Sequence, residues 1–317
     1  MSPELSIIIV NWNGGELLRS CLRSIAQSPP SVAYDIVVVD NASSDDSVAW
    51  LRSSAVSDLL PGIGVYIIEN ADNAGFSKAN NQGIAHSQAP LLFLLNPDTE
   101  LTPRAIDTLI ACLNSGERIG ACGPRLLNTD GSLQHSVWRN PPTAWEIIVT
   151  GLGIWRLIPS RLRGELLLGG HWDHATRRTV PMLFGAAILA RRAMIDEVGG
   201  LDEQFHMYGE DDEWCLRITR AGWLLMFEPG ADVIHHGGQL SAKRWNSSEK
   251  LRVRLNSSFD FQRRCLSRGQ VVANLLAGFG VMTAQRLWRK LRRLPEQEVT
   301  ISQEMHWAEL KRAVKQK

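Results

Sequence analysis

The sequence has few cysteines and almost no excess of charge, and each shortage excludes a class of protein. Its five cysteines include no Cys-x-x-Cys pair, and this odd, scattered set fits a reducing compartment better than a disulfide framework. The formal net charge of +1 gives no reason to expect a nucleic-acid partner. We therefore expect a cytoplasmic protein that does not bind nucleic acid.

An export signal and an apolar run of bilayer length are also lacking. The apolar segment at residues 5–10 has only strand length and follows no basic stretch. Residues 271–284 are apolar, but about fourteen residues are too few to span a bilayer, which needs roughly twenty. No Gly-x-Gly-x-x-Gly follows the first apolar run, which argues against a dinucleotide-dependent oxidoreductase.

The first hundred residues alternate short apolar runs with segments of helix length. Runs rich in Val, Ile and Leu predict strands at 6–10, 36–39, 65–68 and 91–95. Apolar residues at helical spacing predict helices at about 16–27, 45–53, 77–86 and 103–114. Because near-continuous apolar runs suit strands covered on both faces, we predict a mostly parallel, Rossmann-like α/β sheet flanked by helices.

Polar residues follow three of these strands at the points where they end. Asn11 and Asn13 follow the first strand, Asp40 follows the second, and Asn96 and Asp98 follow the fourth. Ligands of open parallel sheets collect beyond the carboxyl ends of the strands. The sequence therefore predicts a ligand site at this edge of the sheet.

The regular alternation fails beyond about residue 124. Trp138, Trp145, Trp155 and Trp172 occur here among prolines and glycines, which indicates an elaborated, substrate-facing region. A strand at 180–190, a helix at 211–221 and a strand at 223–234 are predicted next. Helices follow at 247–266 and 270–294 and at the charged C-terminus.

Six motifs give the chain a resemblance to a known family. They are SIIIVNWN at 6–13, VDNASSD at 39–45, NAGFSKANN at 73–81, NPDT at 96–99, YGEDDEWCLR at 208–217 and HHGG at 235–238. In this order they resemble family 2 glycosyltransferases of the GT-A type, in the rhamnosyltransferase-like branch, over about residues 4–265. The resemblance implies a catalytic domain at 1–265, with a nucleotide-binding half at 1–123 and an acceptor-binding half at 124–265. It leaves a helical extension at 266–317.

The resemblance implies a divalent cation, Mg²⁺ or Mn²⁺, at the diphosphate of a nucleotide sugar. Asp98 is the expected ligand, and Asn96 stands where the usual Asp-x-Asp motif has its first acid, so one charge is missing. His235 is the expected further ligand, with His236 as the alternative. Taken alone, Asp98 could equally cap the following helix, and the two histidines could be structural residues that close a strand.

Four consecutive acids open the predicted helix at 211–221. The resemblance assigns Asp211 as the general base of an inverting transfer and Glu210 as a residue that orients it. Such a base takes the proton of the acceptor hydroxyl as the sugar is attacked. The residue types alone also fit ordinary helix-start chemistry, which we expect of Asp212 and Glu213.

The resemblance implies that the donor nucleotide lies against the ends of the first two strands. Asp40 would accept a hydrogen bond from the base or ribose, and Asn11 would line the same cleft. Asn13 would line it too, although an Asx turn is the simpler account of that residue. The remaining donor-site candidates are Asn73, Gly75, Phe76, Asn80 and Asn96, with Lys78 as a phosphate contact and Gly185 beneath a bound sugar.

The resemblance implies dTDP-L-rhamnose, or another dTDP- or UDP-sugar, as the donor. It implies a lipid-linked saccharide or polysaccharide of the cell envelope as the acceptor. The apolar segment 271–284 precedes five Arg and Lys around Trp288, which predicts peripheral attachment to the inner face of the cytoplasmic membrane. A packed helix with a solvated basic end is the alternative. A metal-dependent phosphoesterase and a non-catalytic sugar-nucleotide-binding protein are the alternative functions, and a homodimer is left open.

Overall fold

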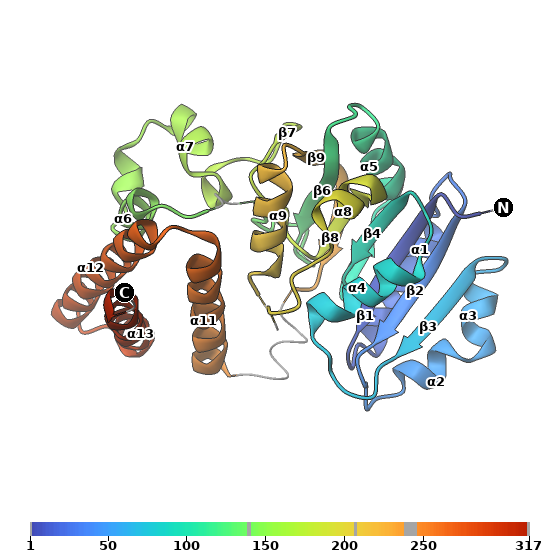
Figure 1. The fold of residues 1–317 in the computed structure, drawn as a ribbon, viewed down its shortest axis with the longest axis horizontal. Coiled ribbons are helices and arrows are strands. Elements are labelled where there is room, and N and C mark those ends of the chain that lie inside the picture. Colours follow the sequence, from blue (N-terminus) through green and yellow to red (C-terminus); the bar gives the residue numbers. More distant parts are fainter. Residues whose placement is uncertain (1, 138–140, 206–207, 238–245, 316–317) are drawn as a thin grey trace. The chain divides into compact units, whose positions relative to one another are not determined.

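The computed structural model describes residues 2–137, 141–205, 208–237 and 246–315 (Figure 1). Its contacts divide the chain into two compact units. Residues 1–137 and 174–240 form the first, here named the sheet unit, and residues 138–173 and 241–317 form the second, the helical unit. The functional boundaries predicted at residues 123 and 265 stay a prediction. Trp138 and Gly238, both noted in the sequence, lie outside the described residues.

The sheet unit is built on a nine-stranded sheet in the order β3-β2-β1-β4-β8-β6-β9-β5, with β7 paired to β9. Its first four strands are parallel: β3 (Gly64–Glu69), β2 (Tyr34–Asp40), β1 (Leu5–Asn11) and β4 (Leu91–Leu95). All seven residues of β1 and all five of β4 are buried, as their apolar runs predict. The four predicted strands are confirmed.

Beyond β4 the sheet is mixed. β8 (Ala187–Arg191) is antiparallel to β4 and to β6 (Ile119–Leu127). β9 (Leu224–His235) runs parallel to β6 and pairs with the short strands β5 (Thr99–Leu101) and β7 (Arg178–Thr179). The predicted α/β sheet is thus confirmed, parallel at one side and mixed at the other.

Four strand assignments differ from the sequence prediction: β8 is shorter than expected, and β5, β6 and β7 were not predicted. The strand predicted at 180–190 begins only at Ala187, so its first part was wrong. β6 was missed, because glycines interrupt its apolar pattern. Both glycines permit close packing: a Cβ at Gly120 would lie 2.8 Å from Met194 Cγ, and one at Gly123 would lie 2.7 Å from Leu183 Cδ2.

Helices cover both faces of the parallel strands. On one face α1 (Glu16–Gln27) and α5 (Ala105–Leu113) share a core with Ile7 and Ile9. On the other face α4 (Phe76–His86) contacts β1, and a Cβ at Gly83 would lie only 2.4 Å from Ile8 Cγ2. The remaining helices are α2 (Ser47–Leu51), α3 (Ser54–Leu59), α8 (Arg192–Val198) and α9 (Glu210–Arg220). The helix predicted at 45–53 is confirmed as the shorter α2, and the second short helix, α3, was not predicted.

The helical unit brings together two segments of the chain. Its elements are α6 (Ala144–Gly151), η1 (Ile154–Leu157), α7 (Ser160–Leu167), η2 (Gly169–His171), α11 (Ser247–Cys265), α12 (Arg268–Leu291) and α13 (Gln297–Lys315). α12 packs against α6 and α13, and capping boxes start α6, α11 and α12. In the described part of the chain, no helix combines the length and the apolar composition that crossing a bilayer requires.

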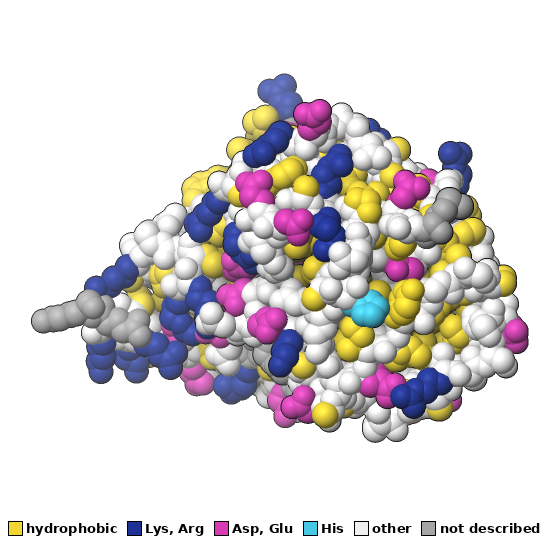
Figure 2. All heavy atoms as spheres, turned by 45° about the vertical axis from the view of Figure 1, so that its right-hand side comes forward, with side chains coloured by type: hydrophobic (Ala, Val, Ile, Leu, Met, Phe, Trp, Pro, Cys, Tyr) yellow, Lys and Arg dark blue, Asp and Glu magenta, His cyan; other side chains and the backbone are white. Residues whose placement is uncertain are grey.

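Charge is divided very unevenly between the two units. The helical unit contains 21 Lys and Arg and 9 Asp and Glu, a formal charge of +12. The sheet unit contains 13 and 24, a formal charge of −11, so the overall +1 conceals two strongly charged parts. Lys and Arg side chains crowd the lower left of the view in Figure 2.

Candidate active site

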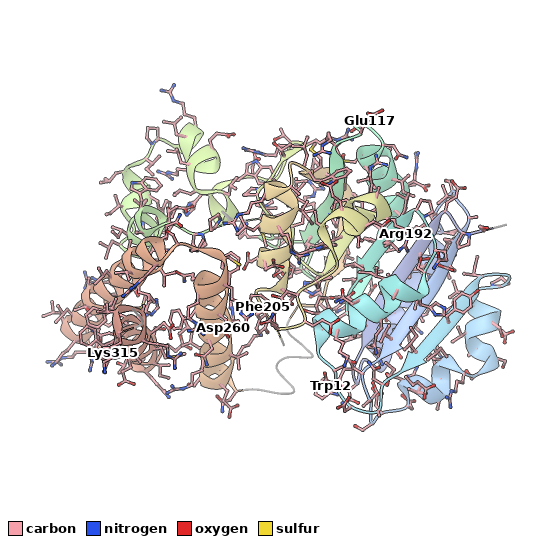
Figure 3. The ribbon with its side chains drawn as sticks, viewed as in Figure 1. Trp12, Glu117, Arg192, Phe205, Asp260 and Lys315 are labelled. Atoms are coloured by element: carbon pink, nitrogen blue, oxygen red, sulfur yellow. The ribbon has the colours of Figure 1, made fainter. Side chains whose placement is uncertain are left out.

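The carboxyl ends of β1 and β2 place Asn11 beside Asp40. The two residues are register partners, and Asn11 Nδ2 donates to Asp40 Oδ1 at 2.7 Å. Asp40 also accepts from the Ser43 backbone N–H at 2.8 Å and from Ser43 Oγ at 2.6 Å. Trp12, which follows β1, marks this edge of the sheet in Figure 3. Since a carboxylate has about four acceptor positions, Asp40 keeps capacity for one further donor, as its predicted role requires.

Asn13 organises the loop that follows β2. Its backbone is left-handed, with φ 53°, and its Oδ1 accepts from the N–H groups of Ser44 at 2.7 Å and Asp45 at 3.2 Å. Gly14 is required beside it, because a Cβ at that position would lie 2.2 Å from Asn11 Oδ1. The structure thus gives Asn13 a loop-holding role, and its nucleotide contact stays a prediction.

The segment at 73–81 forms the start of α4 and the turn before it. Asn73 Oδ1 accepts from the Gly75 N–H at 3.1 Å, and Gly75 has φ 88°. Asn80 is buried and donates to the Phe76 carbonyl at 3.0 Å, while Lys78 is exposed. The left-handed turn before α4 thus uses a glycine, and the amide of Asn80 is used inside its own helix, while the donor contacts of both residues stay a prediction.

Asp98 and His235 come together through the pairing of β5 with β9, in which Thr99 is the partner of His235. His235 Nε2 lies 3.4 Å from Asp98 Oδ1, and both side chains are 7% exposed. His236 points elsewhere, with its Nε2 2.7 Å from Glu100 Oε1. Of the two candidate histidines, the structure brings His235 to Asp98.

These donors suit a hard divalent cation. Asp98 offers a carboxylate and His235 an imidazole, and Asn96 Oδ1 is a buried oxygen with no hydrogen-bond partner in the described structure. Mg²⁺ and Mn²⁺ are usually held by one or two such groups together with substrate phosphates. Among the described residues, no cluster of three or more His, Cys, Asp or Glu is placed to hold a metal. The residues present therefore fit a cation only if the ligand supplies the rest of its shell.

Glu210 and Asp211 begin α9, after Gly209 with φ 92°. Asp211 Oδ2 accepts from the Gly185 N–H at 3.2 Å, and its Oδ1 accepts from the Asp212 N–H at 3.0 Å. Burial raises the pKa of Asp211, although these two hydrogen bonds oppose the rise. Burial and the neighbouring charge of Asp211 raise the pKa of Glu210 to about 8. Near neutral pH, Glu210 is therefore largely protonated beside an ionisable Asp211.

The rest of α9 follows the helix-start expectation. Arg217 pairs with Glu213, one turn earlier, with Nη2 and Oε2 2.6 Å apart. Trp214 and Leu216 are buried in the core, as predicted. Asn81 holds the loop before α9 through two hydrogen bonds of 2.9 Å with the backbone of Leu201.

One short segment, residues 184–186, links Asp98 and His235, here named the cation-compatible pair, to the acids of α9. The Phe184 ring packs on the His235 ring, with centroids 5.8 Å apart, and the next residue, Gly185, donates to Asp211. The carbonyl of Ala186 accepts from the Asn96 N–H at 2.9 Å. Three consecutive residues thus contact His235, Asp211 and the Asn96 loop, which places all of these groups in one site.

Sequence reasoning missed Gln134, whose Oε1 lies 2.6 Å from His235 Nδ1. No periodic pattern or motif marks this residue, which follows a turn at Asn128 and Gly131. Only the three-dimensional pairing reveals it.

A mixed α/β sheet with buried acids and the pair Asp98 and His235 beyond the ends of its strands is the arrangement of a GT-A type glycosyltransferase. The family comparison is more specific. Residues 6–198 match the family model described as glycosyl transferase family 2, and the chain belongs to that family.

Individual relatives agree with this assignment. The chain is 28% identical over 262 residues to the N-acetylglucosaminyl-diphospho-decaprenol L-rhamnosyltransferase of Mycobacterium tuberculosis, covering 74% of this chain and 77% of that protein. It is 25% identical to the low-salt glycan biosynthesis hexosyltransferase Agl10 of Haloferax volcanii, covering 94% and 87%. Among solved structures, the mannosyltransferase PcManGT of Pyrobaculum calidifontis, in complex with GDP-Man and Mn²⁺, matches with a TM-score of 0.57 at 14% identity, covering 100% and 88%. The last likeness shows the fold.

Proposed function

We propose that the protein transfers L-rhamnose, with inversion, from dTDP-L-rhamnose to a lipid-linked saccharide or polysaccharide in cell-envelope glycan synthesis. The name of the Mycobacterium tuberculosis relative supports both a rhamnosyl donor and a lipid-linked acceptor. The observation that carries the proposal is the single site described above, in which the segment at 184–186 contacts His235, Asp211 and the Asn96 loop. A buried carboxylate beside a cation-compatible pair suits transfer from a nucleoside diphosphate.

Asp98 and His235 would hold a divalent cation at the donor diphosphate. When bound, the cation stabilises the charge that develops on the leaving nucleoside diphosphate. The Mn²⁺ in the Pyrobaculum calidifontis complex supports this choice of group. Asn96 contributes a neutral oxygen where a second acid would otherwise stand, so we expect the cation to bind chiefly together with the nucleotide.

Asp211 would act as the general base. The Gly185 N–H and the Asp212 N–H both donate to its carboxylate, which fixes its direction. The raised pKa strengthens it as a proton acceptor, and a positioned base of this kind contributes roughly 10²- to 10⁴-fold to the rate. Glu210, kept protonated by burial, would orient the base or the acceptor without adding a second negative charge.

Asp40 and Asn11 would hold the nucleoside at the ends of β2 and β1. Their mutual hydrogen bond is buried and fixes the Asp40 carboxylate before any ligand arrives. Gly75 has φ 88°, a backbone conformation that glycine adopts readily, and Asn73 stabilises that turn, beside which the donor would lie. A prearranged binding site of this kind reduces the ordering cost of binding.

The helical unit supports peripheral attachment to an anionic membrane surface. Besides its charge of +12, it carries 14 of the 16 exposed large hydrophobic residues found in the described structure. Leu157 in η1 and Leu291 at the end of α12 are 84% and 85% exposed, and Trp288 is 52% exposed. Exposed apolar groups among cations are the features of a surface that meets anionic headgroups.

The exposed Leu157 in η1 and the exposed Leu291 at the end of α12 belong to neighbouring parts of the helical unit. Gln285 Nε2 in α12 donates to the carbonyl of Gly151, the last residue of α6, at 2.7 Å. A Cβ at Gly151 would lie 2.4 Å from Val281 Cγ1, which shows how closely the helices meet. η1 leaves α6 just beyond this contact, and the basic end of α12 follows it. We propose that this region rests on the inner leaflet, where a lipid-linked acceptor would be presented.

A panel of nucleotide sugars tests the catalytic proposal. The purified protein is incubated with each donor, with Mn²⁺, Mg²⁺ or a chelator, and with a short polyprenyl-diphosphate saccharide as acceptor. We expect metal-dependent release of dTDP from dTDP-L-rhamnose, coupled to product formation. Failure of every nucleotide sugar to bind would overturn the proposal. Hydrolysis of a simple phosphate ester without an acceptor would indicate a phosphoesterase, and binding without turnover would indicate a non-catalytic binding protein.

A further inference from the structure

The imidazole of His235 is held from both sides. Its Nε2 faces Asp98 Oδ1 at 3.4 Å, and its Nδ1 faces Gln134 Oε1 at 2.6 Å. A neutral histidine carries its proton on only one of these nitrogens, and only the other can bind a metal. The partner of Nδ1 therefore decides whether Nε2 offers a lone pair beside Asp98.

The hydrogen bonds of the turn before Gln134 determine which atom of the Gln134 amide faces His235. Gln134 Nε2 donates to Asn128 Oδ1 at 3.1 Å, and Asn128 Nδ2 donates to Ser132 Oγ at 2.9 Å. Ser132 Oγ donates in turn to Asp130 Oδ1 at 2.5 Å. Hydrogen bonds with Ser132 lower the pKa of Asp130, so this carboxylate stays ionised and can only accept.

The direction of every hydrogen bond in this chain follows from that charged end. Because Asp130 only accepts, Ser132 donates to it and accepts from Asn128. Asn128 then presents its carbonyl to Gln134, and Gln134 presents its own carbonyl to His235. A carbonyl oxygen cannot donate, so the proton of a neutral His235 must lie on Nδ1.

The backbone and a neighbouring glycine keep Gln134 in place. The Gln134 N–H donates to the Leu126 carbonyl at 2.9 Å, which ties the residue to the end of β6. A Cβ at Gly237 would lie 2.9 Å from Gln134 Nε2 and 3.5 Å from His235 Nδ1. The glycine that follows the two histidines therefore leaves room for the amide.

We propose that Gln134 is a positioning residue that holds His235 in the Nδ1-protonated form, so that Nε2 is presented to a divalent cation beside Asp98. The inference rests on the proposed role of His235 as a metal ligand. Removing such an outer partner of a ligating histidine typically weakens metal binding about 10- to 100-fold. Gln134 lies at Nδ1 of His235, whereas Asp98 lies at Nε2, so Gln134 acts through the histidine.

The test compares Gln134→Met, which removes the acceptor at similar length, with Gln134→Glu, which keeps one. Gln303→Met in the helical unit is the matched control, because Gln303 is also a half-buried glutamine that donates to a side chain. The imidazole nitrogens of His235 are followed by ¹⁵N NMR without metal, and Mn²⁺ affinity is measured by titration in the presence of dTDP. His235 is assigned by the signal that disappears in His235→Ala.

We expect the wild type and Gln134→Glu to show protonated Nδ1 and similar Mn²⁺ affinity. Gln134→Met should lose that preference and bind Mn²⁺ about 10- to 100-fold more weakly, while Gln303→Met should match the wild type. An Nε2-protonated His235 in the wild type, or unchanged Mn²⁺ affinity in Gln134→Met, would overturn the inference. Absence of Mn²⁺ binding by the wild type would overturn it too. Rhamnosyl transfer measured on the same samples shows separately whether the proposed function stands.

Discussion

Replacing Asp211 with asparagine removes the proposed base while keeping its shape. The amide oxygen can still accept the Gly185 N–H that now reaches Asp211 Oδ2 at 3.2 Å, and only the bond that Oδ1 accepts from the Asp212 N–H is lost. Since burial raises the pKa of Asp211, the folded protein gains no stability from ionising this group, and the melting temperature should change little. The loss should therefore appear in catalysis alone.

The expected magnitude is a fall in kcat of roughly 10²- to 10⁴-fold, the usual contribution of a positioned general base. KM for the donor should change little, because the diphosphate is assigned to Asp98 and His235. In the wild type, kcat/KM should also decline as the pH falls through the raised pKa of Asp211, since the protonated acid cannot accept a proton. The Asp211→Asn variant should lack this decline at low pH.

The assay is steady-state release of dTDP from dTDP-L-rhamnose with acceptor, across a pH series. Asp212→Asn is the matched control, because it removes a neighbouring acid assigned to helix-start chemistry and should keep at least half of the wild-type kcat. An Asp211→Asn enzyme within about tenfold of wild-type kcat would refute the assignment. So would an equal loss in both variants, which would point to the charge of the helix start rather than to a base.

Three further predictions concern stability and attachment. Gly83→Val should cost about 1–3 kcal/mol of unfolding free energy in urea denaturation, because its Cβ would lie 2.4 Å from Ile8 Cγ2; an unchanged midpoint would contradict the packing of α4 on β1. Burial and the charge of Asp211 raise the pKa of Glu210 from its ordinary value of 4.5 to about 8, so the stability that protonated Glu210 contributes should be lost as the pH rises between these values. Glu210→Gln should flatten that decline in a pH series of thermal melts, and a parallel decline in both proteins would refute it. The double variant Trp288→Ser and Leu291→Ser should co-sediment with phosphatidylglycerol vesicles at least about fivefold more weakly than the wild type. Its circular dichroism spectrum should be unchanged. Equal binding of the wild type to neutral vesicles would argue against attachment to an anionic surface.

The parallel half of the fold could be predicted because fully buried strands have apolar sequences that are easily recognised. β1 and β4 are buried along their whole length, so their sequences are uninterrupted apolar runs. β6 could not be found in this way, because close packing against Met194 and Leu183 requires Gly120 and Gly123 within the strand. Packing of this kind depends on distant residues and leaves no periodic signal.

The candidate site likewise includes residues that the sequence predicts and residues that it does not. Asp40 and Asp98 lie at strand ends that the alternation predicts, and the order of motifs brings Asp211 and His235 into consideration. The pairing of β5 with β9 distinguishes His235 from His236, and no local pattern in the sequence could do so. Gln134 was missed for the same reason, since its partner lies 101 positions away.

The stereochemistry of the transferred sugar tests the central claim most directly. The purified protein is supplied with dTDP-L-rhamnose, Mn²⁺ and a short polyprenyl-diphospho-N-acetylglucosamine, and the anomeric configuration of the product is determined by NMR. The account predicts a rhamnosylated acceptor with the configuration opposite to that of the donor, formed roughly 10²- to 10⁴-fold more slowly when Asp211→Asn replaces the wild type. A product that retains the donor's configuration, or no transfer from any nucleotide sugar in the presence of metal, would contradict it.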